Sequence, residues 1–247
     1  MKKRLLILGM IFTMVVSSAG CGSSSSDNAG KTDQTKQTAD VQDSQKDTSS
    51  SDKSDNKNDT SYKSADEITM DDLMSHDETP AEDFEFNDST DNIIIEKYVG
   101  KDPIVVIPDE IDGKKVVGFE SAFTLNNNIV AVKIGNNVQE VENSAFSGCK
   151  QLKYVVMGDS VKTIGGRMFA QTNLQELVLN DGLQKIGQDD SNNVLAPPSS
   201  NCGMDLKIPE SVTELHVSEF NLIGKSGSYA EQYANEHADA GVTFTAE

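Results

Sequence analysis

Apolar residues recur along the second half of the chain with a period of 22 to 23 residues. Three segments between 129 and 187 align under one another: IVAVKIGNNVQEVENSAFSGCKQ, LKYVVMGDSVKTIGGRMFAQTN and LQELVLNDGLQKIG. A period in this range is typical of solenoids, in which each repeat buries its apolar face only against its neighbours. The pattern therefore predicts a stack of short coils around one continuous core.

Five coils can be aligned on the last residue of a predicted strand, which is Ile107, Ile134, Met157, Leu179 or Ile208. Further apolar columns lie two residues before this position and four and seven residues after it. The residue that follows each strand is a turn former: Pro108, Gly135, Gly158, Asn180 or Pro209. A phenylalanine column is expected to stack as an aromatic spine: Phe123, Phe146, Phe169 and Phe220.

The two ends of the repeat array carry different patterns, which predict caps. Phe84, Phe86, Ile93 and Ile95 alternate around a polar run and predict a hairpin. Near the C-terminal end, the segment 228–231 has capping-box spacing and predicts a helix, followed by a short strand over 242–244. The fold class is therefore a β-rich repeat solenoid with few helices, over residues 84–247, with a hairpin cap and a helix-strand cap.

Several repeat segments resemble the BspA-like leucine-rich repeats of bacterial surface proteins. The segments are VVIPDEIDGKKVVGFESAF, VQEVENSAFSGC and LKIPESVTEL, and the end, IGKSGSYAEQYANEHADAGVTF, resembles the C-terminal capping segment of that family. The resemblance extends over about residues 83–247 and implies adhesion to host proteins or to other cells. The fourth coil departs from the pattern, because Ser191 replaces the aromatic residue and 188–204 carries an insertion.

The N-terminal segment predicts export and lipid attachment. Lys2, Lys3 and Arg4 precede an apolar stretch of 12 residues, which suits a signal peptide and is too short to span a membrane. The run that ends at Cys21 resembles the lipobox of bacterial lipoproteins. That resemblance implies removal of residues 1–20, a lipid on Cys21, and display on the outer face of the cell membrane of a Gram-positive bacterium. An ordinary secretory signal is the alternative.

Residues 21–83 are rich in Ser and Asp and poor in apolar side chains. Such a segment buries too little surface to offset the entropy of ordering, so we expect a disordered acidic linker. Within it, capping-box spacing at 64–67 and the apolar residues Met70, Leu73 and Met74 predict a short helix over 65–75. This helix either docks on the solenoid or forms only transiently in the linker.

Charge and motifs narrow the function classes. The formal net charge is −19, which disfavours nucleic acid as a partner. His76, His216 and His237 are scattered along the chain, and HExxH, GxSxG and P-loop motifs are absent from the sequence. We therefore expect a binding module without cofactors rather than an enzyme. We also expect the protein to be a monomer. The alternatives are an accessory subunit of an envelope complex and, more remotely, a carbohydrate-active or peptide-processing enzyme.

The candidate ligand site is the concave face of the predicted strands. Alternate residues of each strand point away from the core. The outward residues are apolar in the middle of the row and charged at its sides, which is typical of a protein-binding surface. They are Ala131, Lys133, Tyr154, Val156, Glu176, Val178, Asp205 and Lys207. The expected partner is an extracellular protein or glycan; the alternative is that these residues reflect β-propensity alone.

Two further groups of residues allow more than one interpretation. Asp109, Asp159 and Asp181 occupy one turn column and either hold Ca²⁺ or accept hydrogen bonds from turn amides. Cys149 is either a small buried thiol between coils or one half of a disulfide with Cys202.

Overall fold

The computed structural model of the chain describes residues 62–119, 121–188, 195–197 and 203–247. All of these residues belong to one compact unit. The predicted signal peptide, the lipidation site Cys21, Ser191 and Cys202 lie outside the described residues.

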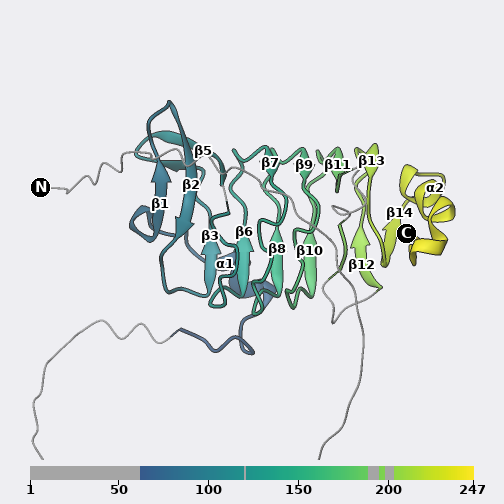
Figure 1. Ribbon diagram of the computed structural model, residues 1–247, viewed down its shortest axis with the longest axis horizontal. Coiled ribbons are helices and arrows are strands. Elements are labelled where there is room, and N and C mark those ends of the chain that lie inside the picture. Colours follow the sequence, from purple (N-terminus) through teal and green to yellow (C-terminus); the bar gives the residue numbers. More distant parts are fainter. Residues whose placement is uncertain (1–61, 120, 189–194, 198–202) are drawn as a thin grey trace, which may run out of the picture. The chain divides into compact units, whose positions relative to one another are not determined.

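Two walls of short parallel strands run along the stack of coils (Figure 1). The first wall is a four-stranded sheet made of β3 (Ile104–Val106), β6 (Ala131–Lys133), β8 (Tyr154–Val156) and β10 (Glu176–Val178). The second wall is made of β7 (Glu140–Val141), β9 (Thr163–Ile164), β11 (Lys185–Ile186) and β13 (Glu214–Leu215). Equivalent positions of successive coils pair with each other, as Val132 does with Val155, so the aligned columns become ladders.

The first end of the stack is a mixed sheet in the order β1-β2-β5-β4. Its strands are β1 (Phe84–Asn87), β2 (Asn92–Tyr98), β4 (Glu110–Ile111) and β5 (Lys114–Phe119), preceded by the 3-10 turn η1 (Ala81–Asp83). The antiparallel pairing of β1 with β2 is the hairpin that the alternation of apolar residues predicts. Because β5 lies parallel beside β2, this hairpin continues the stack rather than standing apart from it.

The other end is a three-stranded parallel sheet in the order β12-β14-β15. Its elements are β12 (Met204–Lys207), β14 (Phe220–Gly224), α2 (Tyr229–Glu236), η2 (Ala238–Ala240) and β15 (Thr243–Ala246). The helix and the last strand lie where the sequence predicts them. β14 pairs with β12 as one turn pairs with the next, so the solenoid has about six turns where the sequence alignment indicates five.

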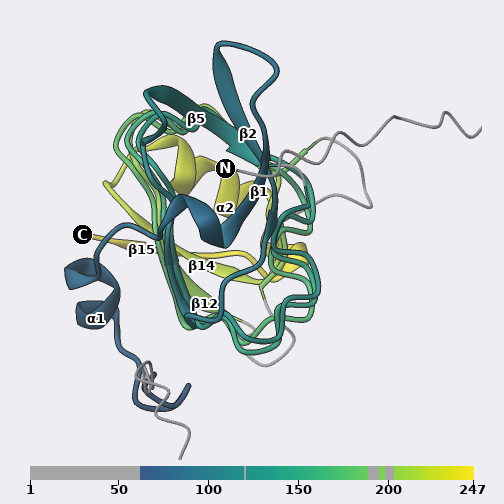
Figure 2. The same cartoon turned by 90° about the vertical axis from the view of Figure 1, so that its left-hand side faces the viewer.

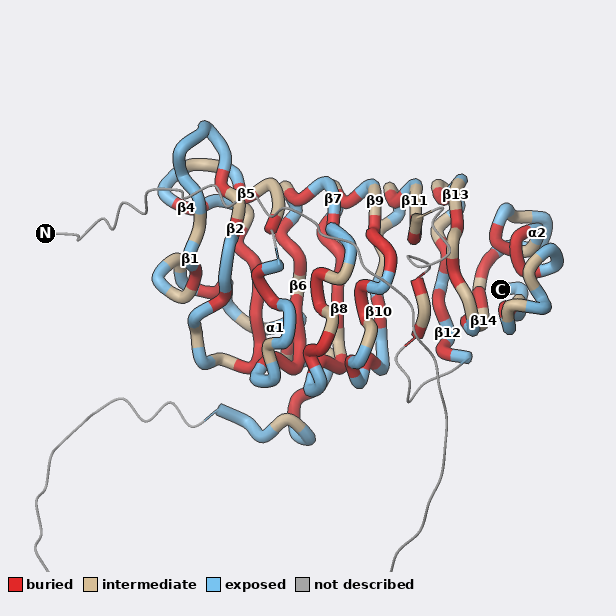
Figure 3. Tube along the Cα trace, in the orientation of Figure 1, coloured by how far each residue is buried: buried red, intermediate tan, exposed pale blue. Residues whose placement is uncertain are grey.

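The core is a single apolar column inside the stack (Figure 3). The predicted phenylalanine spine is fully buried at all four positions, Phe123, Phe146, Phe169 and Phe220. Ring centroids lie 5.4 Å apart between Phe123 and Phe146 and 6.3 Å apart between Phe146 and Phe169. In the irregular fourth coil, the fully buried Leu195 bridges to Val217 of the next coil.

Glycine in the turn column follows from the close approach of successive coils. A Cβ added at Gly158 would lie 2.2 Å from the carbonyl oxygen of Gly135. That distance is far inside van der Waals contact, so any side chain here would force the two coils apart. The turn column thus sets how tightly neighbouring coils can stack.

Candidate functional site

Residues 62–79, which we call the docking segment, lie against the outer face of the first wall. Within it, α1 (Met70–Ser75) packs on β3 and β6 from outside the coil (Figure 2). Ile68 and Leu73 are buried in a second apolar cluster that is separate from the core. The wall contributes Ile104, Val106, Val130, Ala131 and Val156 to this cluster. The predicted helix therefore docks on the solenoid, but it begins at Met70 and not at residue 65, because Thr69 rather than Ser64 is its N-cap. Residues 62–83, expected as the end of the linker, pack against the repeats.

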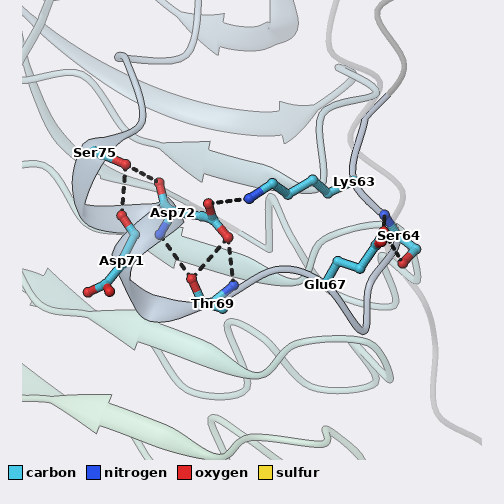
Figure 4. Close-up of polar contacts among 7 residues, drawn as sticks. All are labelled: Lys63, Ser64, Glu67, Thr69, Asp71, Asp72 and Ser75. Carbon is cyan, nitrogen blue, oxygen red and sulfur yellow. Dashed lines mark hydrogen bonds and ion pairs between the residues drawn. The ribbon is translucent and has the colours of Figure 1, made fainter.

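Polar contacts inside the docking segment fix the start of α1 (Figure 4). Thr69 is the N-cap, and its hydroxyl accepts from the backbone N–H of Asp72 while the Asp72 carboxylate accepts from the N–H of Thr69. Lys63 donates to the same carboxylate at 2.6 Å. This bond from Lys63, together with the backbone bond, lowers the pKa of Asp72 to about 2. The capping box satisfies helix amides that have no partner within the helix.

Five polar contacts tie the docking segment to the rest of the solenoid. The Lys153 ammonium donates to the carbonyl oxygen of Ala65 at 2.8 Å and to the carboxylate of Asp66 at 3.0 Å. Thr79 donates its N–H to the carbonyl oxygen of Val106 and accepts the N–H of Val106 on its hydroxyl, both at 2.9 Å. This pair satisfies backbone groups at the edge of β3, which would otherwise be open to another chain. The Nε2 atom of His76 lies 3.3 Å from a carboxylate oxygen of Asp102.

The docking segment divides the predicted ligand face into a covered part and an exposed part. On β6 and β8, Ala131 is fully buried, Val156 is only 8% exposed, and Lys133 and Tyr154 are half-buried. The expectation that Ala131 and Val156 are open to solvent is therefore wrong, because Ile68 and Leu73 cover them. The exposed part of the face lies further along the stack, at Glu176, Val178, Asp205 and Lys207.

A groove with a volume of about 700 Å³ opens in this exposed part, between β10 and β12. Val178, an exposed apolar residue at 40%, lies on one side, and the buried side chains of Leu177 and Met204 form its floor. Its lining is Gln175, Glu176, Leu177, Val178, Leu179, Asp181, Gly203, Met204, Asp205, Lys207, Pro209 and Ile223. Half of the predicted site residues thus meet around one cavity.

The groove has an acidic rim. Glu176, Asp181 and Asp205 contribute three carboxylates, against one ammonium from Lys207. Lys207 is already paired with Glu247 at 2.7 Å, and Asp205 accepts a hydrogen bond of 2.7 Å from Asn221. The net field in the groove is therefore negative, which favours a cationic partner.

Two side chains of the turn column accept hydrogen bonds from backbone amides of the next coil. Asp109 accepts from the N–H of Asn136, and Asn136 in turn accepts from the N–H of Asp159 at 3.3 Å. Asp181 lies apart from this chain of bonds, in the lining of the groove. Among the described residues, no cluster of three or more Asp, Glu, His or Cys side chains has the arrangement of a metal site. Of the three turn carboxylates, Asp109 thus caps a backbone amide, and that amide belongs to the next coil.

Cys149 is a free, fully buried thiol whose sulfur donates to the carbonyl oxygen of Phe123 at 2.8 Å. Burial raises the pKa of this thiol to about 11, so it is a poor nucleophile at neutral pH.

His216 contacts Glu214 at 3.1 Å and His237 stacks on Tyr233 with ring centroids 4.0 Å apart. In the part of the chain that the structure describes, no helix is long and apolar enough to cross a membrane.

Comparison with known proteins agrees with this architecture. Residues 119–194 match the family described as the BspA type leucine rich repeat region. The chain thus contains a leucine-rich repeat region of the BspA type, which forms the middle of its solenoid.

Two solved structures are similar to this chain. One is a leucine rich repeat protein of T. pallidum, TpLRR, with a TM-score of 0.48, 29% identity, and coverage of 60% of this chain and 71% of that chain. Another is a leucine-rich repeat protein from Bacteroides ovatus, with a TM-score of 0.40, 16% identity, and coverage of 60% of this chain and 43% of that chain. The search of curated proteins finds no match.

Truncating Leu73 should release the docking segment. Leu73→Ala removes a fully buried side chain from the small second cluster, and such a change typically costs about 2–5 kcal/mol. We expect amide hydrogen exchange at residues 70–79 to accelerate strongly while exchange in β8 stays slow. The matched control is Met74→Ala, one residue further along α1, where the side chain is 55% exposed. Equal exchange rates in the two variants would contradict the packing described here.

The Asp72 carboxyl should titrate well below the ordinary aspartate pKa of about 3.9. Its folded-state pKa is lowered, so its contribution to the stability of the docking segment is complete above about pH 4 and is lost as the pH falls through about 2. Carboxyl-carbon NMR should give a midpoint near 2. Lys63→Met should raise this midpoint, whereas Lys97→Met should leave it unchanged. A midpoint near 4 in the unaltered protein would show that the Lys63 contact is absent in solution.

Proposed function

We propose that this protein is a lipid-anchored binding module that recognises an extracellular protein through the exposed part of its strand face. The observation that carries the proposal is the groove between β10 and β12, where the exposed Val178 lies among charged residues. An apolar centre with a charged rim suits a protein partner, since the centre contributes desolvation and the rim contributes orientation. The groove volume of about 700 Å³ is large enough to hold several side chains of a partner.

The covered part of the face supports this location for the ligand site. Tyr154 and Val156 are the apolar residues that would otherwise compete for a partner, and the docking segment shields them. Displacing that segment would break the buried contacts of Ile68 and Leu73 and the ammonium contact of Lys153. A partner that binds the groove avoids this cost.

The membrane attachment in the proposal rests on the N-terminal sequence. Cys21 stands at the position where a lipobox places the lipid-bearing cysteine, after a basic start and an apolar stretch. Residues 22–61 separate this cysteine from the docking segment. Acyl chains on Cys21 would anchor the protein through burial of their CH₂ groups, at about 0.8 kcal/mol for each.

Binding should depend on Val178. The full chain is screened on an array of extracellular matrix proteins and glycans, and affinities for the proteins that it retains are measured for two variants. Val178→Lys should weaken binding at least tenfold, because it removes the apolar centre of the groove and places there a positive charge that repels a cationic partner. Val99→Lys is the matched control, since Val99 is 42% exposed, similar to Val178, and lies near the other end of the stack.

Two outcomes of this screen would contradict the proposal. Retention of only glycans would oppose a protein partner, and equal binding by the two variants would place the ligand elsewhere. Co-purification with other envelope proteins, with no retained array partner, would favour an accessory subunit.

Lipid attachment should require Cys21. The full chain is expressed in a Gram-positive host that is fed labelled palmitate. The label and the membrane association should both be lost in Cys21→Ala and kept in Cys202→Ala, which also removes one thiol. A labelled Cys21→Ala variant would show that the anchor is elsewhere, and an unlabelled parent chain would favour ordinary secretion.

A further inference from the structure

The ladder of parallel strands is interrupted on one wall of the solenoid. β3, β6, β8 and β10 form one continuous sheet, whereas β12 pairs with β14 and belongs to a different sheet. The opposite wall has no such break, because β11 pairs with β13 across the same two coils. The fourth and fifth coils are therefore joined on one wall and separated on the other.

A backbone hydrogen bond that recurs from coil to coil locates the break. In each case the residue after a strand donates its N–H to a carbonyl at or one residue before the end of the next strand, at 2.8 to 2.9 Å. The pairs are Ile107 to Lys133, Ile134 to Val156, Met157 to Val178, and Ile208 to Ile223. Within the described residues, the equivalent bond from Leu179 to Lys207 is absent. β10 and β12 thus face each other across the groove without pairing.

The opposite wall shows that the two coils stay in register despite the break. The carbonyl oxygen of Gln184 accepts from the N–H groups of Thr213 at 3.0 Å and Glu214 at 3.2 Å. His216 donates its N–H to the carbonyl oxygen of Ile186 at 2.8 Å. These are the same kinds of bonds that join the other coils. The separation of β10 from β12 is therefore a local opening of one wall.

We propose that an extended peptide segment of a protein partner adds to this wall as a strand inside the groove, pairing with the free edge of β10 and extending toward β12. This proposal rests on the proposed function and specifies how the groove binds. Strand addition supplies main-chain hydrogen bonds for affinity, and alternate side chains supply specificity. The backbone at Leu179 offers the donor that lacks a coil-to-coil bond.

The alternation of β10 defines the side chains of the added strand. Glu176 and Val178 point outward and the buried Leu177 points inward, so a neighbouring parallel strand alternates in the same way. Its inward residues meet Leu177 and should be apolar. Its outward residues meet the carboxylates of Glu176, Asp181 and Asp205 and should be Lys or Arg. A second copy of this chain fits poorly, because its own net charge is −19.

The probe for this inference is a synthetic peptide of alternating Lys and Val, capped at both ends, added to the full chain. We expect calorimetry to detect binding that is at least tenfold weaker for the Glu-Val analogue. Binding should also be at least tenfold weaker for a Lys-Val peptide that is N-methylated at alternate residues, because methylation removes main-chain donors. Equal binding by the N-methylated peptide would overturn strand addition, and so would absence of binding by the Lys-Val peptide.

Charge-neutral variants test the location. Glu176→Gln combined with Asp181→Asn should weaken Lys-Val binding at least tenfold. The matched control is Glu140→Gln combined with Glu142→Gln, which removes two exposed carboxylates on and beside β7. Equal affinities for the two double variants would place the peptide outside the groove and overturn the proposal.

Hydrogen exchange tests the backbone pairing. The Leu179 amide should exchange quickly in the free chain and become protected when the Lys-Val peptide binds. Slow exchange in the free chain would mean that this edge already has a partner, and binding without protection would mean that the peptide lies on the surface. Either result overturns strand addition.

The two proposals fail separately. An array protein that binds through Val178 without protecting Leu179 leaves the proposed function intact and removes only the strand mechanism. Lys-Val binding with protection of Leu179, combined with Val178-independent array binding, removes the proposed function instead.

Discussion

Contact between neighbouring coils is the constraint on which the structure depends. No coil can bury its apolar columns alone, so each coil needs a neighbour at a fixed spacing on both sides. The stacked phenylalanines fill the space between coils, and the recurring backbone bond sets their register. At Gly135 and Gly158 the backbones approach so closely that a side chain would separate them. The apolar core, the register of the strands and the glycines of the turns therefore all follow from close contact between neighbouring coils.

The same requirement explains why the outer face of the first wall is divided. Strands in a solenoid present alternate residues outward, and β-branched side chains suit those positions whether or not they bind a partner. At β3, β6 and β8 these outward residues form an apolar surface, and the docking segment covers it with Ile68 and Leu73. The chain thus uses one part of its strand face for its own packing. The remaining part, at β10 and β12, carries more charge and stays exposed.

Periodicity predicts the fold well because the residues that make each contact recur at a constant spacing. The columns that contain Val132, Val155 and Phe146 are buried as the alignment predicts, and the alternation around 84–95 forms the expected hairpin. The sixth turn is missed because Phe220 to Gly224 follows β12 after a connection shorter than the repeat period.

The candidate site is less predictable because it depends on contacts between distant parts of the chain. The sequence of the docking segment indicates a helix, but burial of Val156 by Leu73 is a long-range contact that no local pattern reports. For the same reason, local sequence patterns do not indicate the bond between Thr79 and Val106 or the ammonium contact of Lys153. Four of the eight predicted face residues nevertheless meet at the groove.

The opening between β10 and β12 is compatible with a stable stack because other contacts join the same two coils. Leu195 occupies the core of the fourth coil and bridges to Val217, while β11 and β13 keep the second wall continuous. Beyond the opening, β12 is held by β14, which in turn pairs with β15. Loss of one short ladder therefore leaves the coils connected, and the backbone edge of β10 becomes available for recognition. A regular repeat has no such edge in its interior, so the irregular coil is the position where this solenoid can acquire a specific partner.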